Sequence, residues 1–210
     1  MKIIFAVGLT LIFGIGLALN AYAAGDATKG KAAYAVCAAC HGTNGMGNKA
    51  LNAPMIAGQE AWYLERQLKN FKAGIRGADA KDRYGMQMRP MALTLANDQA
   101  VSDMAAFVSS MPMPKHSEST VKGDAKAGKA SYTICQTCHG PKGGGNRALN
   151  SPKLTGLQDW YIVRQLKNFK AGIRGTKDGD LYGMQMRPMA MTLANDKVIN
   201  NVVAYIATFK

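Results

Sequence analysis

The chain has 210 residues, of which 48% are hydrophobic and 19% charged, and its formal net charge is +13. This composition excludes a disordered chain, because it supplies enough apolar side chains for packed cores. The basic residues are spread along the chain rather than attached to a nucleic-acid recognition motif, so we do not expect nucleic acid as a partner.

The N-terminal segment is predicted to be a signal peptide covering residues 1–23. Lys2 precedes an apolar run at residues 3–19, and Ala21-Tyr22-Ala23 forms a small-x-small cleavage site. We therefore expect export to the periplasm and a mature chain that begins at Ala24. The alternative is an uncleaved membrane anchor, because the run is longer than a usual signal core of ~7–15 residues and close to a spanning helix of ~20.

The rest of the chain is an internal duplication with an offset of 98 residues. Residues 25–112 align with residues 123–210 without a gap, and 49 of the 88 aligned positions are identical. Stacked repeats recur at ~20–50 residues, so a period of this length indicates duplication of a whole domain. We predict domains at residues 24–111 and 123–210. Residues 112–122, rich in proline and small polar residues, should form a linker, and His116 within it is expected to be solvated.

Each repeat is predicted to be all-α, with three short helices. The first runs from about Lys29 into Cys37 or Cys40. The second follows Gly58 and ends at Gly77, with apolar residues at helical spacing: Leu64, Leu68, Phe71 and Ile75, repeated as Ile162, Leu166, Phe169 and Ile173. The third begins at an Asn97 or Asp98 cap and ends before Pro112. Three short helices bury little apolar surface, so a large bound cofactor is expected to complete the core.

A C-x-x-C-H motif ends the first predicted helix of each repeat. It comprises Cys37, Cys40 and His41 in one copy, and Cys135, Cys138 and His139 in the other. This spacing is typical of c-type haem attachment, in which the thiols form thioethers and the histidine binds iron. The alternatives are a zinc site, a thioredoxin-like redox pair or a disulfide. Zinc needs four nearby ligands and the redox pair needs a βαβ context, and neither is visible in the sequence.

The second iron ligand is expected to be a methionine. Outside the linker no histidine remains for it, whereas each repeat contains Tyr-Gly-Met-Gln-Met-Arg-Pro-Met-Ala, at 84–92 and 182–190. Pro90 disfavours a helical Arg89, so we expect an extended stretch from which Met88 reaches inward. Met88 and Met186 are therefore the preferred ligands. Met91 and Met189 rank second, and Met86 and Met184 rank last.

These motifs resemble those of the cytochrome c4 family over the whole mature chain: a C-x-x-C-H early and an M-x-x-M late in each of two fused class I cytochrome c domains. The resemblance implies an all-α fold, two covalently bound haem c groups and Met88 and Met186 as iron ligands. It also implies that the carbonyls of Pro54 and Pro152 accept a hydrogen bond from the ligand histidines. Trp62, Tyr63, Trp160 and Tyr161 either pack on haem or belong to the core.

The function implied by this resemblance is electron transport without catalysis, with a terminal oxidase as acceptor. The partner is expected to be an acidic redox protein, because the chain is basic, and an anionic membrane surface is a second candidate. Two rival functions are the cytochrome subunit of a periplasmic dehydrogenase, for example one that oxidises a sulfur compound, and a two-haem peroxidase. The peroxidase requires an open iron position, which two methionine segments argue against.

Overall fold

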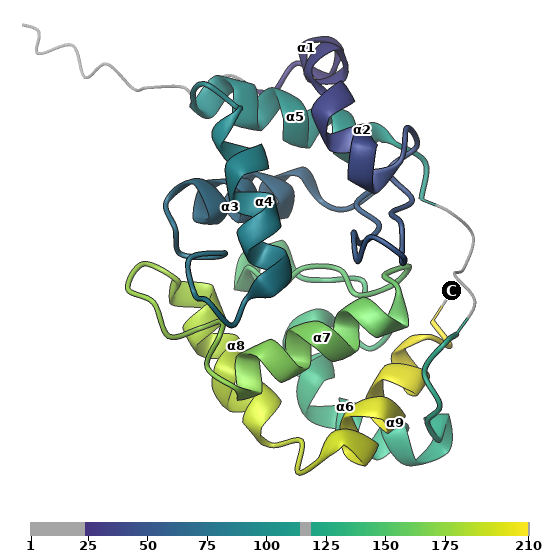
Figure 1. Cartoon of the computed structure of the whole chain (residues 1–210). Coiled ribbons are helices and arrows are strands. Elements are labelled where there is room, and N and C mark those ends of the chain that lie inside the picture. The colour runs from purple at the N-terminus through teal and green to yellow at the C-terminus, as the bar shows by residue number, and fades with distance from the viewer. Residues whose placement is uncertain (1–23, 114–118, 210) are drawn as a thin grey trace, which may run out of the picture.

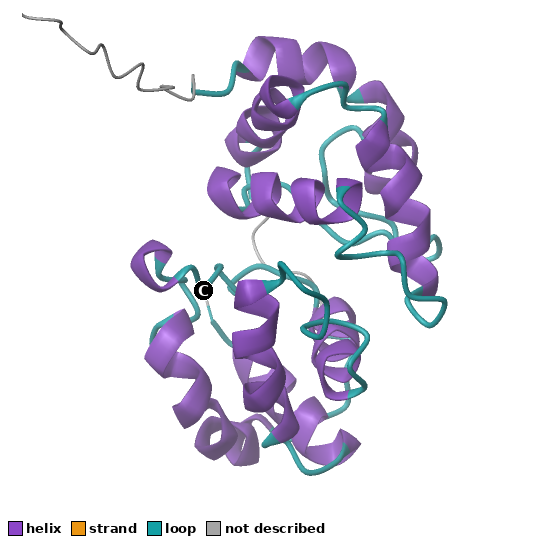
Figure 2. Cartoon of the chain, turned by 90° about the vertical axis from the view of Figure 1, so that its left-hand side faces the viewer, coloured by secondary structure: helices purple, strands orange, loops and turns teal. Residues whose placement is uncertain are grey.

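The computed structural model describes residues 24–113 and 119–209, which form two helical halves, one above the other in Figure 1. Within these ranges the chain contains helices and loops but no strand, as Figure 2 shows. Its only β pairing there consists of two isolated bridges, Asn48 with Ala53 and Asn146 with Ser151. The all-α prediction is confirmed.

The two halves use corresponding helices. The N-terminal half contains α1 (Ala27–Ala33), α2 (Ala35–His41), α3 (Ala61–Lys72), α4 (Arg83–Leu93) and α5 (Asp98–Ser110). The C-terminal half contains α6 (Ala125–His139), the short 3-10 helix η1 (Arg147–Leu149), α7 (Asp159–Lys170), α8 (Leu181–Met191) and α9 (Asp196–Ile206). In each half the first helix packs on the last, and the last two helices pack on the α3 or α7 helix.

The first helix differs between the halves. In the N-terminal half it is split at Tyr34, whose N–H bonds to the carbonyl of Lys31 three residues back, whereas α6 continues through the equivalent Tyr132. Both tyrosines are buried and donate their hydroxyl to the carbonyl of the glycine after the motif histidine. The cysteine-containing segment therefore has the same anchor in both halves.

The predicted end of the second helix is wrong. Helix α3 stops at Lys72, and Gly74 follows in the left-handed region with φ +71°, so Ile75 lies beyond the helix rather than on its apolar face. The same happens at Gly172 after α7. Glycine adopts this conformation without steric cost, and it therefore terminates the helix before Gly77.

The third predicted helix is confirmed as α5. Asn97 caps it by accepting a hydrogen bond from the N–H of Ala100 at 2.9 Å, and its buried face includes Val101, Ala105 and Val108. This face belongs to a core that also contains Tyr34 and Met104. An equivalent core in the second half is built from Tyr132 and the buried face of α9.

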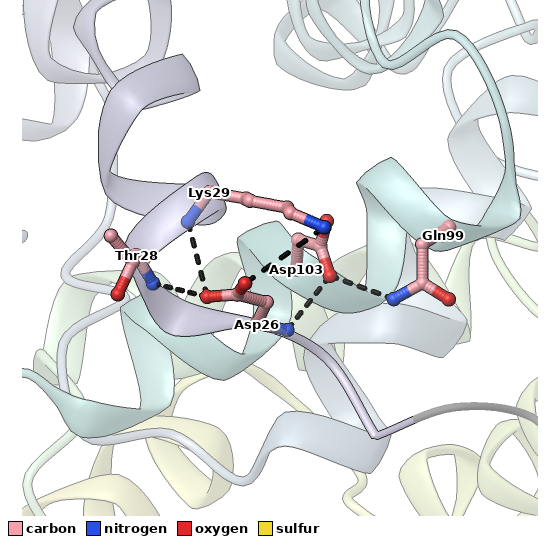
Figure 3. Close-up of polar contacts among 5 residues, drawn as sticks. All are labelled: Asp26, Thr28, Lys29, Gln99 and Asp103. Carbon is pink, nitrogen blue, oxygen red and sulfur yellow. Dashed lines mark hydrogen bonds and ion pairs between the residues drawn. The ribbon is translucent and has the colours of Figure 1, made fainter.

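The start of α1 is fixed to α5 through two aspartates. Asp26 caps α1, accepting from the N–H groups of Thr28 and Lys29, and its own N–H donates to Asp103 at 2.7 Å (Figure 3). Gln99 donates to the same carboxylate oxygen of Asp103 at 2.8 Å (Figure 3). In the second half Asn201 takes the place of Asp103 and accepts from the N–H of Asp124.

The C-terminal part of the predicted linker lies on the second half. The buried carboxylate of Asp159, at the start of α7, accepts hydrogen bonds from Ser119, Thr120 and Val121. Residues 114–118, with His116, and the predicted signal peptide at 1–23 lie outside the described residues. Among the helices that are described, none is both long and apolar enough to span a bilayer.

Candidate haem-binding clefts

Each half contains a cleft lined by its C-x-x-C-H motif. The end of α2 brings Cys37, Cys40 and His41 to the first cleft, and the end of α6 brings the equivalent residues to the second. The empty space of the clefts is about 1350 and 1340 Å³, including the part that is open to solvent. Their walls are mainly apolar, and those of the first include Val36, Leu51, Leu64, Leu68, Phe71 and Val108. A flat macrocycle with apolar faces fits such walls.

Within the described residues, the thiols lack the partners that the alternative sites require. None of the four cysteines is in a disulfide, and the described residues contain no group of three or more His, Cys, Asp or Glu that could hold a metal. Burial raises the pKa of Cys37, and it raises that of Cys135 to about 11. These thiols are therefore protonated at neutral pH, unlike the low-pKa cysteine of a thioredoxin-like pair.

The two motif histidines have the orientation expected of iron ligands. His41 is 5% exposed and His139 is 6% exposed. Nδ1 of His41 lies 2.7 Å from the carbonyl oxygen of Pro54, and Nδ1 of His139 lies 2.8 Å from that of Pro152. A carbonyl only accepts, so Nδ1 carries the proton and Nε2 is left with its lone pair. The predicted proline acceptors are confirmed.

Burial also keeps both imidazoles neutral. It lowers the pKa of His41 and His139, and the hydrogen bond to the proline carbonyl offsets only part of this effect. Neutral imidazole is the form that binds a metal, and a fixed Nδ1 donor orients the ring and raises the basicity of Nε2.

A tight loop places each proline carbonyl. In the first half the backbone groups of Asn48 and Ala53 exchange two hydrogen bonds, at 2.8 and 3.0 Å, and Asn52 turns the chain with φ 57°. Gly47 has φ +79°, and a Cβ there would lie 2.5 Å from the backbone nitrogen of Met55. Only glycine therefore lets the loop approach so closely. Asn150 and Gly145 repeat these conformations in the second half.

The methionine segments are helical, which corrects the prediction of an extended stretch. Met88 and Met91 lie on α4 despite Pro90 inside this helix. Asp82 caps the helix at Gly85, and α4 packs against α3, so packing overrides the local preference of a residue before proline. Residues three apart share a helix face, and both methionines line the first cleft. Met186 and Met189 line the second.

The third methionine of each segment lies away from its cleft. Met86 is 43% exposed and Met184 is 42% exposed, and neither contributes to a cleft wall. The structure therefore brings two methionines to each cleft, together with the histidine.

The predicted aromatic residues divide into two groups. Tyr63 and Tyr161 line both clefts. Trp62 and Trp160 line neither; each packs edge-on against the adjacent tyrosine, with ring centroids 5.9 and 6.1 Å apart. Because residues of both α3 and α7 line each cleft, the two clefts come together at the boundary of the halves.

A quartet of polar side chains, missed by the sequence analysis, closes this meeting point. Arg76 donates to Gln67 at 2.6 Å and to Gln165 at 3.5 Å, and Arg174 donates to Gln165 at 2.6 Å and to Gln67 at 3.3 Å. Both arginines are 6% exposed. The sequence signal was available, because all four residues recur at the 98-residue offset, but nothing in the spacing shows that the two pairs meet.

The quartet buries two positive charges. Nε of Arg76 and Nε of Arg174 are buried without a hydrogen-bond partner, and among the described residues neither guanidinium forms an ion pair. Burial lowers the pKa of Arg174, and the neighbouring charge of Arg76 lowers it further. Two buried like charges call for negative groups nearby. Haem propionates are carboxylates and would provide such groups. Both the polar end of the clefts and their apolar walls therefore fit haem.

Known proteins share this arrangement. A sequence model of the family described as Cytochrome c matches residues 27–112 and 125–210. Cytochrome c4 of Azotobacter vinelandii is 36% identical over 210 residues, covering 94% of this chain and 96% of that protein. The thiosulfate dehydrogenase electron acceptor of Stutzerimonas stutzeri is 32% identical over 181 residues, covering 81% and 77%. The crystal structure of reduced recombinant cytochrome c4 from Pseudomonas stutzeri superposes with a TM-score of 0.70 at 35% identity, covering 89% of this chain and all of that one.

Proposed function

This chain belongs to the cytochrome c4 family, and from that premise we propose that it is a periplasmic electron carrier that delivers electrons to a terminal oxidase. The observation that supports this most is the pair of equivalent clefts, each with a buried histidine facing methionines, which meet at the domain boundary. The two cytochrome c domains and their C-x-x-C-H motifs imply two covalently bound haem c groups. Each haem supplies a one-electron couple when bound.

The side chains have separate roles in this proposal. Cys37 and Cys40 in one domain, and Cys135 and Cys138 in the other, hold the haem through thioethers. Nε2 of His41 and Nε2 of His139 would bind the haem iron, while the Nδ1–H of each ring donates a hydrogen bond to the proline carbonyl. Arg76 and Arg174 offer N–H donors to the propionates.

We propose that Met88 and Met186 would supply the second iron ligand in each domain. Both are half-buried and line their clefts, as Met91 does, whereas Met189 is 37% exposed. A thioether ligand raises the reduction potential relative to a second histidine, which suits a carrier placed near the oxidising end of a chain. An iron held by both a histidine and a methionine would be closed to peroxide, so we favour transport over a peroxidase.

The proposed partner surface is basic. Residues 123–210 contain 13 basic and 5 acidic residues, against 10 and 7 in residues 24–111. An acidic redox protein should therefore associate faster at low salt, and mainly through the C-terminal domain. The relative named as a thiosulfate dehydrogenase electron acceptor favours a second candidate function, in which the chain takes electrons from a dehydrogenase. Co-purification of a stoichiometric dehydrogenase subunit would support this candidate.

We also propose that the exported chain starts at Ala24 and comprises domains 24–111 and 123–210 joined by linker 112–122. The small-x-small site and the 98-residue register support these limits. Mass spectrometry of the purified holoprotein should find no peptide from residues 1–23. An intact N-terminus would instead indicate a retained anchor.

The ligand proposal is tested by optical spectra of alanine variants. We expect Met88→Ala and Met186→Ala each to abolish, for one haem, the charge-transfer band of methionine-ligated ferric haem. Met86→Ala and Met184→Ala are matched controls on the same helices, and they should leave the band unchanged because both side chains lie outside the clefts. If Met91→Ala or Met189→Ala removes the band instead, the ligand assignment is wrong.

A further inference from the structure

The loops that carry the proline acceptors are held by the opposite domain. Pro54 and Pro152 fix the Nδ1 protons of His41 and His139. The residues that precede and follow each proline form hydrogen bonds with side chains of the opposite domain. These contacts repeat with approximate two-fold symmetry.

On the N-terminal side of each proline the contact is an arginine. Arg164 of α7 donates to the carbonyl oxygen of Asn52 at 3.1 Å and also to its side-chain oxygen. Arg66 of α3 donates to the carbonyl of Asn150 at 2.9 Å and to its side-chain oxygen at 3.2 Å. Both asparagines are the left-handed residues, with φ 57° and 54°, that lie two positions before the proline. Each arginine therefore binds the turn on which the position of the proline carbonyl depends.

Aromatic rings from both domains fix these guanidinium groups. Arg66 lies over the ring of Trp62 in its own domain, at 5.0 Å from the centroid, and over Tyr182 of the other domain, at 4.4 Å. Arg164 is stacked in the same way by Trp160 at 4.8 Å and by Tyr84 across the boundary at 4.1 Å. A planar guanidinium with several donors can stack and bind two oxygens at once, which a lysine cannot do.

On the C-terminal side of each proline the contact is an acceptor at the start of α3 or α7. The N–H of Met55 donates to Oε1 of Gln158 at 2.9 Å, and the N–H of Lys153 donates to Oε2 of Glu60 at 3.0 Å. Glu60 and Gln158 are equivalent positions in the duplication. Each proline is thus bracketed, two residues before and one residue after, by side chains of the opposite domain.

We propose that Arg66 and Arg164 are positioning residues for electron transfer, which hold the proline carbonyl of the opposite domain and thereby fix the ligand histidine of the opposite haem. This inference rests on the proposed function, in which His41 and His139 bind iron. Arg66 acts on His139 and Arg164 acts on His41, so the effect is crossed. A role limited to joining the domains would disturb both histidines together.

The crossed effect is measured through exchange of the Nδ1 proton with solvent. In the reduced holoprotein the ligand histidines give ring-current-shifted imidazole signals, and their Nδ1–H exchange is followed by NMR. Arg66→Lys keeps the charge but loses the paired hydrogen bonds and the stacking. Loss of one charge-assisted contact is worth roughly 1.5 kcal/mol, or about tenfold in an opening equilibrium. We therefore expect about tenfold faster exchange at His139 and no change at His41. Arg164→Lys should give the reverse.

Arg83→Lys is the control, because Arg83 is exposed and lies at the start of α4, outside both proline loops; this variant should change neither exchange rate. Midpoint potentials of the two haems provide a second readout. The haem of the opposite domain should shift more than the haem of the mutated domain. Glu60→Ala, which removes the acceptor for Lys153, should affect His139 in the same direction as Arg66→Lys even if the latter variant is unstable.

Equal acceleration at both histidines, or acceleration only within the mutated domain, would overturn the proposal. Unchanged exchange in both lysine variants would overturn it as well. Failure of the proposed function has a different signature: the wild-type holoprotein would then lack shifted imidazole signals for His41 and His139.

Discussion

The two domains differ least where they surround the clefts and most where they meet the rest of the chain. The C-x-x-C-H cysteines and histidine, the asparagine and proline of the loop, and the methionine segment are identical in both, as is the arginine and glutamine quartet. The first helix, by contrast, is split in one domain and continuous in the other, and Asp159 in one corresponds to Ala61 in the other. The duplication therefore retained the cofactor environment and the mutual contacts, while the outer supports diverged.

The largest difference between the domains should follow from removing the haem-attachment cysteines of one of them. Cys135→Ala combined with Cys138→Ala should yield a protein with one haem instead of two, in which the C-terminal domain loses cooperative unfolding. Each domain has fewer than ninety residues, a small apolar core and a large cleft that this core lines in part. Without the cofactor, such a domain is only marginally stable. Mass, haem content and calorimetry measure this.

The N-terminal domain serves as the internal control for this variant. It should keep its haem and its methionine-ligated spectrum, and Cys37→Ala with Cys40→Ala should give the mirror-image result. Loss of both haems from either double variant would show that the domains do not acquire their cofactors independently, against the equivalence of the two clefts.

The sequence was sufficient for the duplication, the helical class and the cysteines, histidines and methionines that line the clefts. These follow from a repeat register, from apolar periodicity and from motifs whose chemistry is local. It was insufficient where a local preference competed with packing. Pro90 disfavours a helix at Arg89, yet α4 continues through it because Asp82 caps the helix and α3 covers it. The same limitation applies to α3, for which Gly77 was the predicted terminator, whereas Gly74 is the glycine that follows its end.

The domain boundary was the least predictable region. Gln67 and Arg76 meet their counterparts across an approximate two-fold relation, which no spacing within one repeat encodes. Arg66 and Arg164 look like ordinary helix-surface charges in sequence. Their hydrogen bonds to the asparagines of the opposite proline loop, and their stacking with Tyr182 and Tyr84, show that they bind the opposite domain. Contacts of this kind depend on how two bodies dock, which the sequence pattern of either one does not specify.

Substitution of Asp159, which corresponds to Ala61 in the other domain, should have an effect of intermediate size. Its burial alone would raise its pKa, but hydrogen bonds from Val121 and Thr120 outweigh burial and hold the pKa below its usual range. We expect Asp159→Asn to lower the free energy of unfolding of the C-terminal domain by about 2 kcal/mol at neutral pH, the value of hydrogen bonds to a charged acceptor. Denaturant unfolding of the holoprotein measures this.

The pH dependence follows from the direction of this shift. Because the pKa of Asp159 is lower in the folded protein than the unfolded value of about 3.9, the carboxylate stabilises the fold fully above that value. Its contribution is lost as the pH falls through the folded pKa. The stability difference between the wild type and Asp159→Asn should therefore be constant from about pH 5 to pH 8 and shrink below about pH 4. Ala61→Ser, at the equivalent position without a linker contact, is the control and should show no such dependence.

Substitution of Asp103 by asparagine should have the smallest effect, because the equivalent residue of the second domain is already an asparagine. Asn201 accepts from the N–H of Asp124 just as Asp103 accepts from that of Asp26. Asp103→Asn should therefore lower the melting temperature at neutral pH only slightly, since an amide oxygen can accept the same hydrogen bonds but without the help of a charge. The hydrogen bond from Asp26 and that from Gln99 lower the pKa of Asp103, so the wild type should lose stability in acid through this group while the variant should not. Calorimetry at neutral and acidic pH distinguishes the wild type from the variant. A large loss of stability for the variant at neutral pH would show that the two domains, although alike at their clefts, do not support their first helices in equivalent ways.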